Sequence, residues 1–296
     1  MSPPPIRKVV FPAAGLGTRI LPATAVVPKE LLPVVDKPII QYGVEEALRA
    51  GLSEVILVSS PEKAMLEQHF DRHPTLENLL ESRGKGALLD GLREVVRQVA
   101  LSTVFQDEPL GLGHAVLVSA ELVGEEPFAV VLSDDIIDAE PVALQQMLSV
   151  YEEVAGPVLL VERVPRDAVG RYGIIDGTAL GDGVYRVNNL VEKPAPAEAP
   201  SDLAIIGRYL LTPDVFGALS ETGAGSGGEI QLTDALERLL ARRPIHAVEL
   251  RGVRQDAGNK IGYLRAILYF AQKHPEVGDE ATAIIRDAVP DVAPRS

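Results

Sequence analysis

Short, uniformly apolar runs alternate with stretches of helical spacing along residues 8–164. Apolar runs predict buried strands, whereas apolar residues that recur every three or four positions predict helices that bury one face. Both kinds of element have ordinary lengths, and Asp36, Pro38 and Gly51 suit the cap, first turn and stop of the first helix. The predicted strands are residues 8–12, 54–59, 102–106, 127–133 and 158–164, and the predicted helices are residues 38–50, 76–99, 114–122 and 141–154. The alternation predicts an α/β fold with a Rossmann-like mixed, mostly parallel central sheet covered by helices.

The pattern changes after residue 166. Three predicted strands are separated by Gly, Asp and Pro turns, and we expect them to form an antiparallel insertion laid on the sheet. They are followed by two helices with a strand between them. The predicted strands are residues 172–176, 184–191, 203–211 and 245–250, and the predicted helices are residues 230–242 and 259–273. We therefore expect a single domain over residues 1–275, with halves at 1–165 and 166–275, and a C-terminal helix and tail over 276–296.

Charge and composition exclude several classes of protein. There are 28 Lys and Arg residues against 42 Asp and Glu, a formal net charge of −14, whereas a general nucleic-acid-binding protein needs a basic face. The absence of Cys excludes disulfides, thiolate nucleophiles and Cys-type zinc or iron–sulfur sites. The first residues form no signal segment, and no apolar run reaches the ~18 residues of a membrane span. We therefore expect a cytoplasmic protein without membrane or nucleic-acid partners.

A glycine-containing loop follows the first predicted strand, with the sequence Ala14-Gly15-Leu16-Gly17-Thr18-Arg19. Glycine lets a ligand approach the backbone, and successive N–H groups in such a turn can bind an anion. The loop is not a P-loop, because no Gly-Lys-Ser/Thr follows, and it lacks the third Gly of a Rossmann fingerprint. A Pro-punctuated segment continues to Lys29, so Arg19 and Lys29 are candidates for binding phosphate oxygens. The alternative is a structural turn beside two solvated charges.

Acidic residues follow two of the predicted strands. Asp134 and Asp135 come directly after residues 127–133, and ligands of open α/β sheets bind at the carboxyl ends of strands. Adjacent carboxylates repel each other unless a cation compensates, and without Cys a hard, oxygen-bound cation such as Mg²⁺ is the natural choice. Asp256, after residues 245–250, is a second candidate. The alternatives are a turn for the first pair and a helix cap for Asp256.

Several short blocks occur together in one order along residues 7–273. Jointly they resemble the sugar-1-phosphate nucleotidylyltransferase family, and within it the bacterial branch that uses UTP and glucose 1-phosphate. The blocks are Ala14-Gly15-Leu16-Gly17-Thr18-Arg19, Pro28-Lys29, Leu112-Gly113-His114-Ala115-Val116, Glu192-Lys193-Pro194, Gly228-Glu229-Ile230-Gln231-Leu232-Thr233-Asp234 and Asp256-Ala257-Gly258-Asn259-Lys260. The resemblance implies an enzyme that makes UDP-glucose and pyrophosphate by in-line attack at the α-phosphate, with Mg²⁺ as cofactor. It also implies a homodimer or homotetramer.

The resemblance also assigns roles to individual residues. It implies Arg19 and Lys29 as catalytic residues and Asp134 and Asp256 as metal ligands, with Asp135 a less certain neighbour. The nucleotide-binding residues it implies are Ala14, Gly15, Gly17, Thr18, Gln106 and Gly111. The residues it implies for the sugar phosphate are Gly173, Glu192, Lys193 and Glu229. Without the resemblance, Gln106 is an ordinary surface residue, Glu192 and Lys193 an exposed ion pair, and Glu229 a first-turn acid that favours the helix dipole.

Two positions depart from the family pattern, because Ala25 and Leu110 stand where close relatives commonly carry Lys. Both changes remove positive charge near the expected triphosphate. Three alternatives stay open: the same chemistry with dTTP or another hexose 1-phosphate, a non-catalytic sugar-nucleotide-binding regulatory protein on this fold, and a Rossmann dehydrogenase. The first differs in a few pocket residues only, and the failed glycine fingerprint argues against the last.

Overall fold

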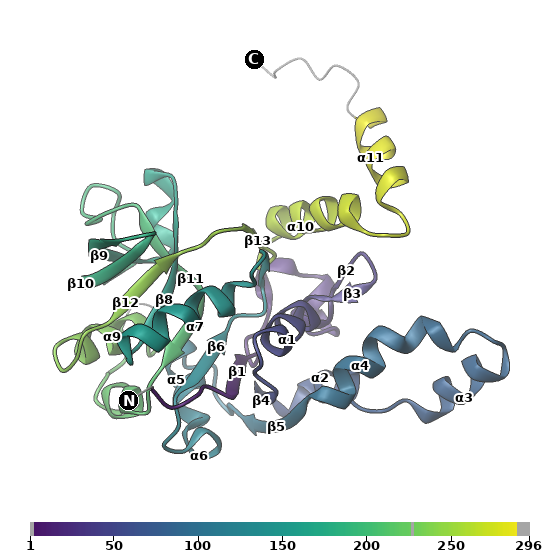
Figure 1. The fold of residues 1–296 in the computed structure, drawn as a ribbon, viewed down its shortest axis with the longest axis horizontal. Helices are drawn as coiled ribbons and strands as arrows, with labels where there is room; N and C mark the ends of the chain where they lie inside the picture. The colour runs from purple at the N-terminus through teal and green to yellow at the C-terminus, as the bar shows by residue number, and fades with distance from the viewer. Residues whose placement is uncertain (1–2, 226–227, 289–296) are drawn as a thin grey trace.

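The structure is a computed structural model that describes residues 3–225 and 228–288. A nine-stranded sheet crosses the molecule in the order β5-β4-β1-β6-β11-β8-β12-β10-β9, and helices cover both of its faces (Figure 1). The strands are β1 (Lys8–Pro12), β4 (Glu54–Ser59), β5 (Ala100–Phe105), β6 (Phe128–Val131), β8 (Val158–Arg163), β9 (Gly173–Gly181), β10 (Val184–Glu192), β11 (Leu203–Leu211) and β12 (His246–Glu249). All nine predicted strands are present: three have the predicted bounds, five differ by one or two residues at one or both ends, and β9 extends five residues beyond its predicted end.

The two halves of the sheet differ in strand direction. β5, β4, β1 and β6 pair in parallel, whereas β11 runs antiparallel to both β6 and β8. β10 is antiparallel to β12 and β9, and β12 is parallel to β8. The sheet is mixed, as predicted, but its parallel character belongs mainly to the first half. The expectation of an insertion laid on the sheet is wrong, because β9, β10 and β11 are strands of the central sheet itself.

The predicted helices are present close to their expected positions, whereas the helices at residues 65–69 and 214–220 were not predicted. Residues 76–99 form two helices separated by a turn at the predicted break, and the helix expected at 38–50 begins at Ile39 with Pro38 as N-cap, so Asp36 is not its cap. The helices are α1 (Ile39–Arg49), α2 (Met65–His69), α3 (Pro74–Ser82), α4 (Asp90–Gln98), α5 (Leu112–Val118), α6 (Ala120–Val123), α7 (Ala143–Val154), α8 (Asp214–Ser220), α9 (Leu232–Leu240), α10 (Lys260–Lys273) and α11 (Gly278–Asp287). The tail expected after α11 falls on residues 289–296, outside the described residues.

Alternation along the strands divides the core into two layers. On β1, Val10 packs with α5, α8 and α9 on one face, whereas Val9 and Phe11 pack with α1 and α7 on the other. All three side chains are fully buried, as expected for a strand covered on both faces. The uniformly apolar runs of the sequence follow from this arrangement.

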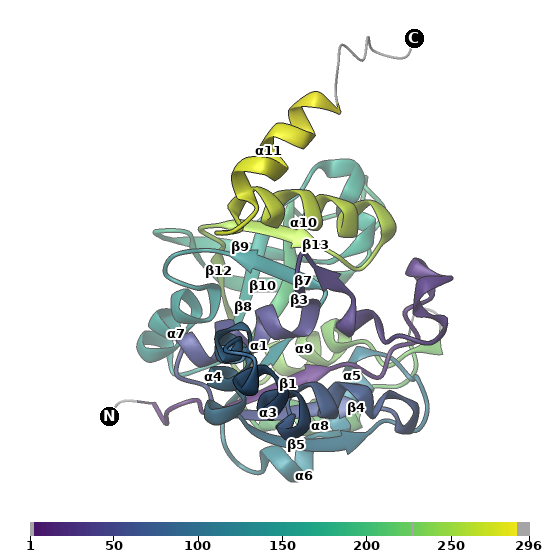
Figure 2. The same ribbon diagram turned by 90° about the vertical axis from the view of Figure 1, so that its right-hand side faces the viewer.

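Two short antiparallel ladders lie outside the central sheet. β2 (Pro33–Val34) pairs with β3 (Lys37–Pro38), and β7 (Asp135–Asp138) pairs with β13 (Val253–Asp256). In the second ladder Asp256 lies directly opposite Asp135, which places two distant acidic segments side by side. Figure 2 shows α10 beside β13, with α11 projecting from the body. Among the described residues, no helix is long and apolar enough to cross a membrane.

Candidate active site

Every predicted site residue lines one of two adjoining cavities, which share Asp134 just after the carboxyl end of β6. The loop cavity, about 480 Å³, lies against residues 14–19, and the strand cavity, about 750 Å³, lies against the ends of β9, β10 and β13. The loop cavity is lined by Ala14, Gly15, Gly17, Thr18, Arg19, Lys29, Gln106, Gly111, Asp134 and Glu229. The strand cavity is lined by Arg19, Asp134, Gly173, Glu192, Lys193, Glu229 and Asp256. Arg19, Asp134 and Glu229 belong to both, so one ligand can extend through the two.

The glycine-containing loop presents backbone to the loop cavity. Gly17 has a φ of 64°, in the left-handed region, and a Cβ there would lie 3.3 Å from the Cβ atoms of Lys29 and Thr24. The Thr24 hydroxyl donates to the Gly17 oxygen at 2.8 Å and fixes this turn. A Cβ at Gly15 would meet nothing within 4 Å. Gly17 is therefore required by the fold, whereas Gly15 leaves open space for a ligand.

Lys29 and Asp134 form an ion pair at the junction of the two cavities. Lys29 Nζ lies 2.7 Å from Asp134 Oδ2, and both side chains are mostly buried. Burial alone would raise the pKa of Asp134, but the charge and hydrogen bond of Lys29 outweigh it, so the pKa falls below its ordinary value. Burial opposes the charge of Lys29 as well, yet Asp134 and Glu30 raise the pKa of Lys29. Both groups are therefore ionised at neutral pH.

Asp134 and Asp256 converge on one point beside Gly258. A Cβ at Gly258 would lie 2.8 Å from Asp134 Oδ2 and 3.1 Å from Asp256 Oδ1. Asp256 Oδ2 pairs with Arg171 at 3.0 Å, so each of these acids has a cationic partner. Asp256 is not the cap of α10, because Asn259 occupies that position and accepts from the Gly262 N–H.

This acid pair fits a hard divalent cation. Among the described residues no three His, Asp or Glu side chains cluster tightly enough to hold a metal by themselves. Two carboxylates are nevertheless a suitable donor set for Mg²⁺, which usually keeps several waters and takes further oxygens from substrate phosphates. Asp134 and Asp256 are the residues that could hold such an ion.

Asp135 has a different environment from its neighbour. Its carboxylate accepts from Arg254 Nη1 at 2.5 Å and from the Gly207 N–H at 3.0 Å. Burial raises the pKa of Asp135, as do the charges of Asp134 and Asp256, while Arg254 acts in the opposite direction. Arg254 and the Gly207 N–H hold the two oxygens of Asp135, so this residue supports the acidic turn.

The strand cavity is lined by charged side chains that bind one another. Lys193 Nζ lies 2.9 Å from Glu192 Oε1, and Lys193 adopts a φ of 45°, which turns the chain just after β10. Arg254 donates to Asp135, to Glu162 at 2.8 Å and to the Tyr172 hydroxyl at 3.0 Å. The sequence interpretation missed Arg254, because an isolated Arg outside any motif gives no signal of the three segments it joins.

Gly173, Gly111 and Gln106 make contacts within the protein. A Cβ at Gly173 would lie 2.7 Å from Thr233 Oγ1, and one at Gly111, whose φ is 99°, would lie 2.7 Å from Glu229 Cβ. Gly111 thus allows the Glu229 segment to pack against the loop cavity. Gln106 Nε2 lies 3.2 Å from the Gly111 oxygen and 2.9 Å from His114 Nδ1, which fixes its amide.

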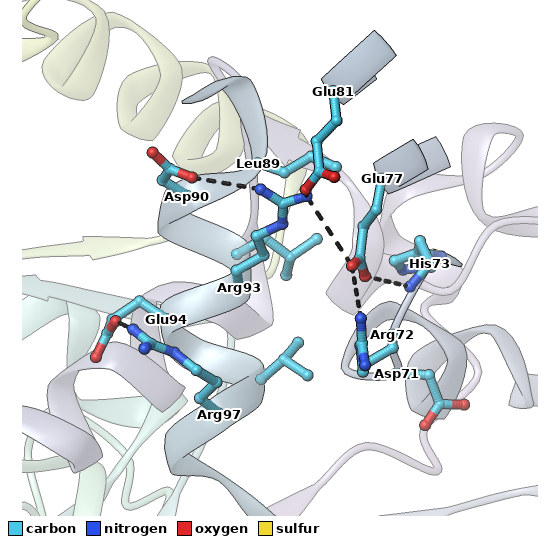
Figure 3. A pocket seen from close by; sticks show the side chains of 12 residues that line it. Asp71, Arg72, His73, Glu77, Glu81, Leu89, Asp90, Arg93, Glu94 and Arg97 are labelled. Atoms are coloured by element: carbon cyan, nitrogen blue, oxygen red, sulfur yellow. Dashed lines mark hydrogen bonds and ion pairs between the residues drawn. The ribbon is translucent and has the colours of Figure 1, made fainter. Parts of the chain in front are cut away.

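A further hollow of about 670 Å³ lies between α3 and α4 (Figure 3), and it shares no lining residue with the two cavities. Its charged side chains largely pair with one another, as Arg93 does with Glu81 at 2.7 Å and Arg72 with Glu77 at 2.9 Å. None of the predicted site residues lines it. We therefore place the candidate site at the two adjoining cavities.

Comparisons with known proteins agree with the fold described above. The model of the nucleotidyl transferase family matches residues 8–273. A UTP–glucose-1-phosphate uridylyltransferase of Bacillus subtilis is 46% identical over 275 residues, which is 93% of this chain and 94% of that protein. A UDP-glucose pyrophosphorylase solved with UDP-glucose is 44% identical with a TM-score of 0.84, covering 91% of this chain and 100% of the other. A UTP-bound enzyme of the same kind from Acinetobacter baumannii is 39% identical with a TM-score of 0.89, covering 96% and 100%.

Proposed function

The chain belongs to the nucleotidyl transferase family, and we propose that it transfers a uridylyl group from UTP to glucose 1-phosphate, giving UDP-glucose and pyrophosphate. The observation that carries the proposal is the shared wall of the two cavities. Arg19, Asp134 and Glu229 line both, so a nucleotide in one and a sugar phosphate in the other meet at Asp134. Relatives with this printed activity cover nearly the whole chain, which supports the same chemistry here.

The loop cavity takes the nucleotide in this proposal. Backbone groups of Ala14 and Gly15 contact the base, Gly17 and Thr18 shape the turn, and the Gln106 amide faces the uracil edge near Gly111. Arg19 and Lys29 lie where the triphosphate enters the junction. A guanidinium offers two parallel donors to phosphate oxygens, whereas an ammonium supplies a compact charge. Together they bind the phosphates and offset the charge that develops on the leaving pyrophosphate.

The strand cavity takes the sugar phosphate. Glu192 and Glu229 accept hydrogen bonds from sugar hydroxyls, Lys193 binds the phosphate, and the sugar ring packs against the backbone at Gly173. The proposed division of the domain follows from this: residues 1–165 bind the nucleotide and residues 166–275 the sugar phosphate. Asp134 and Asp256 would hold a Mg²⁺ ion, which when bound supplies positive charge to the phosphate oxygens.

The reaction needs no covalent intermediate on the protein. An oxygen of the sugar phosphate attacks the α-phosphorus of UTP in line, and the bond to the bridging oxygen of the β-phosphate breaks. Pyrophosphate leaves with that electron pair. Because the attacking oxygen is already anionic, no general base is required, and the protein contributes positioning and charge neutralisation.

The experiment that tests this function is a substrate panel. Purified protein with Mg²⁺ is given each nucleoside triphosphate with each of several sugar 1-phosphates, and pyrophosphate release is followed. We expect UTP with glucose 1-phosphate to give the highest kcat/KM. A higher kcat/KM with dTTP or with another sugar 1-phosphate would change the proposed substrates but not the proposed type of reaction. Binding of UDP-glucose without turnover of any pair would contradict the proposal.

A further inference from the structure

Lys63 contacts the glycine-containing loop, although it is not among the described residues that line the loop cavity. It ends the 3-10 helix η4 (Pro61–Lys63), which follows β4, the parallel neighbour of β1. Its ammonium donates to the backbone oxygens of Ala13 and Gly15, the latter at 2.7 Å, and to Glu30 Oε2 at 3.0 Å. The Lys63 side chain therefore links the loop backbone at Ala13 and Gly15 to Glu30, the residue that follows Lys29.

The ion pair that Lys63 makes with Glu30 is buried. The Lys63 side chain is 11% exposed and that of Glu30 is 0% exposed. Among the described residues, Glu30 Oε1 has no hydrogen-bond partner, so the pair is incompletely satisfied. Desolvation of two charges often costs more than their attraction returns, and two apolar side chains would commonly be no less stable. A contribution to stability therefore does not explain this pair well. The role of Lys63 is better explained by its hydrogen bonds to the loop carbonyls.

Those bonds orient two peptide groups. In a trans peptide the C=O and the following N–H point in opposite directions, because the unit is planar. The Ala13 and Gly15 oxygens point to Lys63, so the N–H groups of Ala14 and Leu16 point away from it. Ala14 and Leu16 both line the loop cavity. If either peptide turned over, a carbonyl oxygen would face the cavity in place of a donor and would repel an anion.

We propose that Lys63 is a positioning residue for nucleotide binding, which fixes the peptide planes of Ala13–Ala14 and Gly15–Leu16 so that their N–H groups face the bound nucleotide. The inference rests on the proposed function for the choice of UTP as ligand. Lys63 itself touches no substrate and acts only through the loop. Glu30, fully buried beside it, holds the ammonium in place.

The central variant is Lys63→Met, which keeps the length of the side chain and removes its donors. We expect the Kd for UTP, measured by calorimetry without sugar phosphate, to rise on the order of tenfold, since two hydrogen bonds that orient the loop are lost. The KM for glucose 1-phosphate stays within about twofold. Lys37→Met is the matched control, because Lys37 pairs with Glu45 at 2.6 Å outside both cavities. It leaves the Kd for UTP unchanged.

Lys63→Met also removes the ammonium that donates to buried Glu30 and leaves Lys29 as the cation that acts on that carboxylate, so loss of stability must be separated from loss of positioning. The double variant Lys63→Met/Glu30→Gln removes the buried negative charge and recovers thermal stability, while the loop carbonyls still lack their donor. We expect its Kd for UTP to stay raised. A double variant that recovers stability and UTP affinity together would overturn the inference, as would an unchanged Kd in Lys63→Met.

Hydrogen exchange in the ligand-free protein gives a readout independent of the substrate. Peptides covering residues 13–19 exchange faster in Lys63→Met and in the double variant than in wild type or Lys37→Met. Equal exchange in all four proteins would contradict the role of Lys63. If the wild type releases no pyrophosphate from UTP and glucose 1-phosphate, the proposed function fails, but this measurement still decides the role of Lys63.

Discussion

The two cavities are built from different parts of the chain. Three glycines, Gly15, Gly17 and Gly111, contribute only backbone to the lining of the loop cavity, and Arg19 and Lys29 supply charge. The wall of the strand cavity is a set of charged side chains that pair with one another. Binding to a wall of backbone groups depends on the backbone conformation, whereas binding to a wall of side chains depends on which side chains are present. Substitutions in the loop cavity (the backbone side) and in the strand cavity (the side-chain side) should therefore impair the protein in different ways.

The largest effect is expected where the cavities meet. Asp134→Asn keeps the shape of the side chain but removes the charge that Lys29 and the proposed Mg²⁺ share. We expect kcat for pyrophosphate release to fall on the order of a thousandfold, because charge stabilisation at a phosphate oxygen contributes several kcal/mol. Binding of Mn²⁺, followed by electron paramagnetic resonance, should weaken in parallel. Near-normal turnover in this variant would show that Asp134 is not needed for the reaction.

On the backbone side, Gly111→Ala should act through conformation. Its φ of 99° disfavours Ala, and the new Cβ would lie 2.7 Å from Glu229 Cβ. We expect the free energy of unfolding to fall by about 2–3 kcal/mol, since backbone strain and overpacking each cost on the order of 1–3 kcal/mol. Gly15→Ala is the matched control, because its Cβ would meet nothing within 4 Å and should change stability by less than about 0.5 kcal/mol. Equal losses in urea unfolding would refute the distinction.

On the side-chain side, Lys193→Ala should act through charge. The expected result is a KM for glucose 1-phosphate raised roughly tenfold to a hundredfold, because a charge-assisted bond to phosphate contributes about 1.5–3 kcal/mol. The KM for UTP should change by less than about twofold, which makes the second substrate the internal control. Initial rates with each substrate varied in turn decide the matter. A defect confined to UTP would place Lys193 on the wrong side of the junction.

The same difference between backbone and side chains explains what the sequence could predict. The glycine-containing loop after β1 was predicted because it is contiguous, and so was the carboxyl-end position of Asp134. The ladder of β7 and β13 was missed, since Val253-Arg254-Gln255-Asp256 has no apolar alternation and pairs with a segment far earlier in the chain. Lys63 and Arg254 were missed for the same reason: their acceptors lie 50 and 119 positions away, at Ala13 and Asp135. A side chain that acts across the fold leaves no local pattern.

The smallest predicted effect concerns a charge that this chain lacks. Ala25 is exposed in the 3-10 helix η2 (Ala23–Ala25), next to Thr24, which binds the Gly17 oxygen. The family resemblance predicts Lys at this position. Ala25→Lys should lower the KM for UTP about two- to fivefold at low ionic strength, because an added cation attracts the triphosphate. The gain should shrink at about 0.5 M salt, where exposed charges are screened within a few ångströms.

Ala23→Lys adds the same charge to the same short helix and is the matched control. If Ala25→Lys acts by contact with the phosphates, its effect should exceed that of Ala23→Lys and persist in part at high salt. If both variants lower the KM equally and lose the gain together with salt, only the summed field matters. That second result would mean that nucleotide binding depends little on the positions of exposed side chains and mainly on the backbone conformation that Lys63 maintains. Unchanged KM values in both variants at low salt would contradict any electrostatic role for this helix.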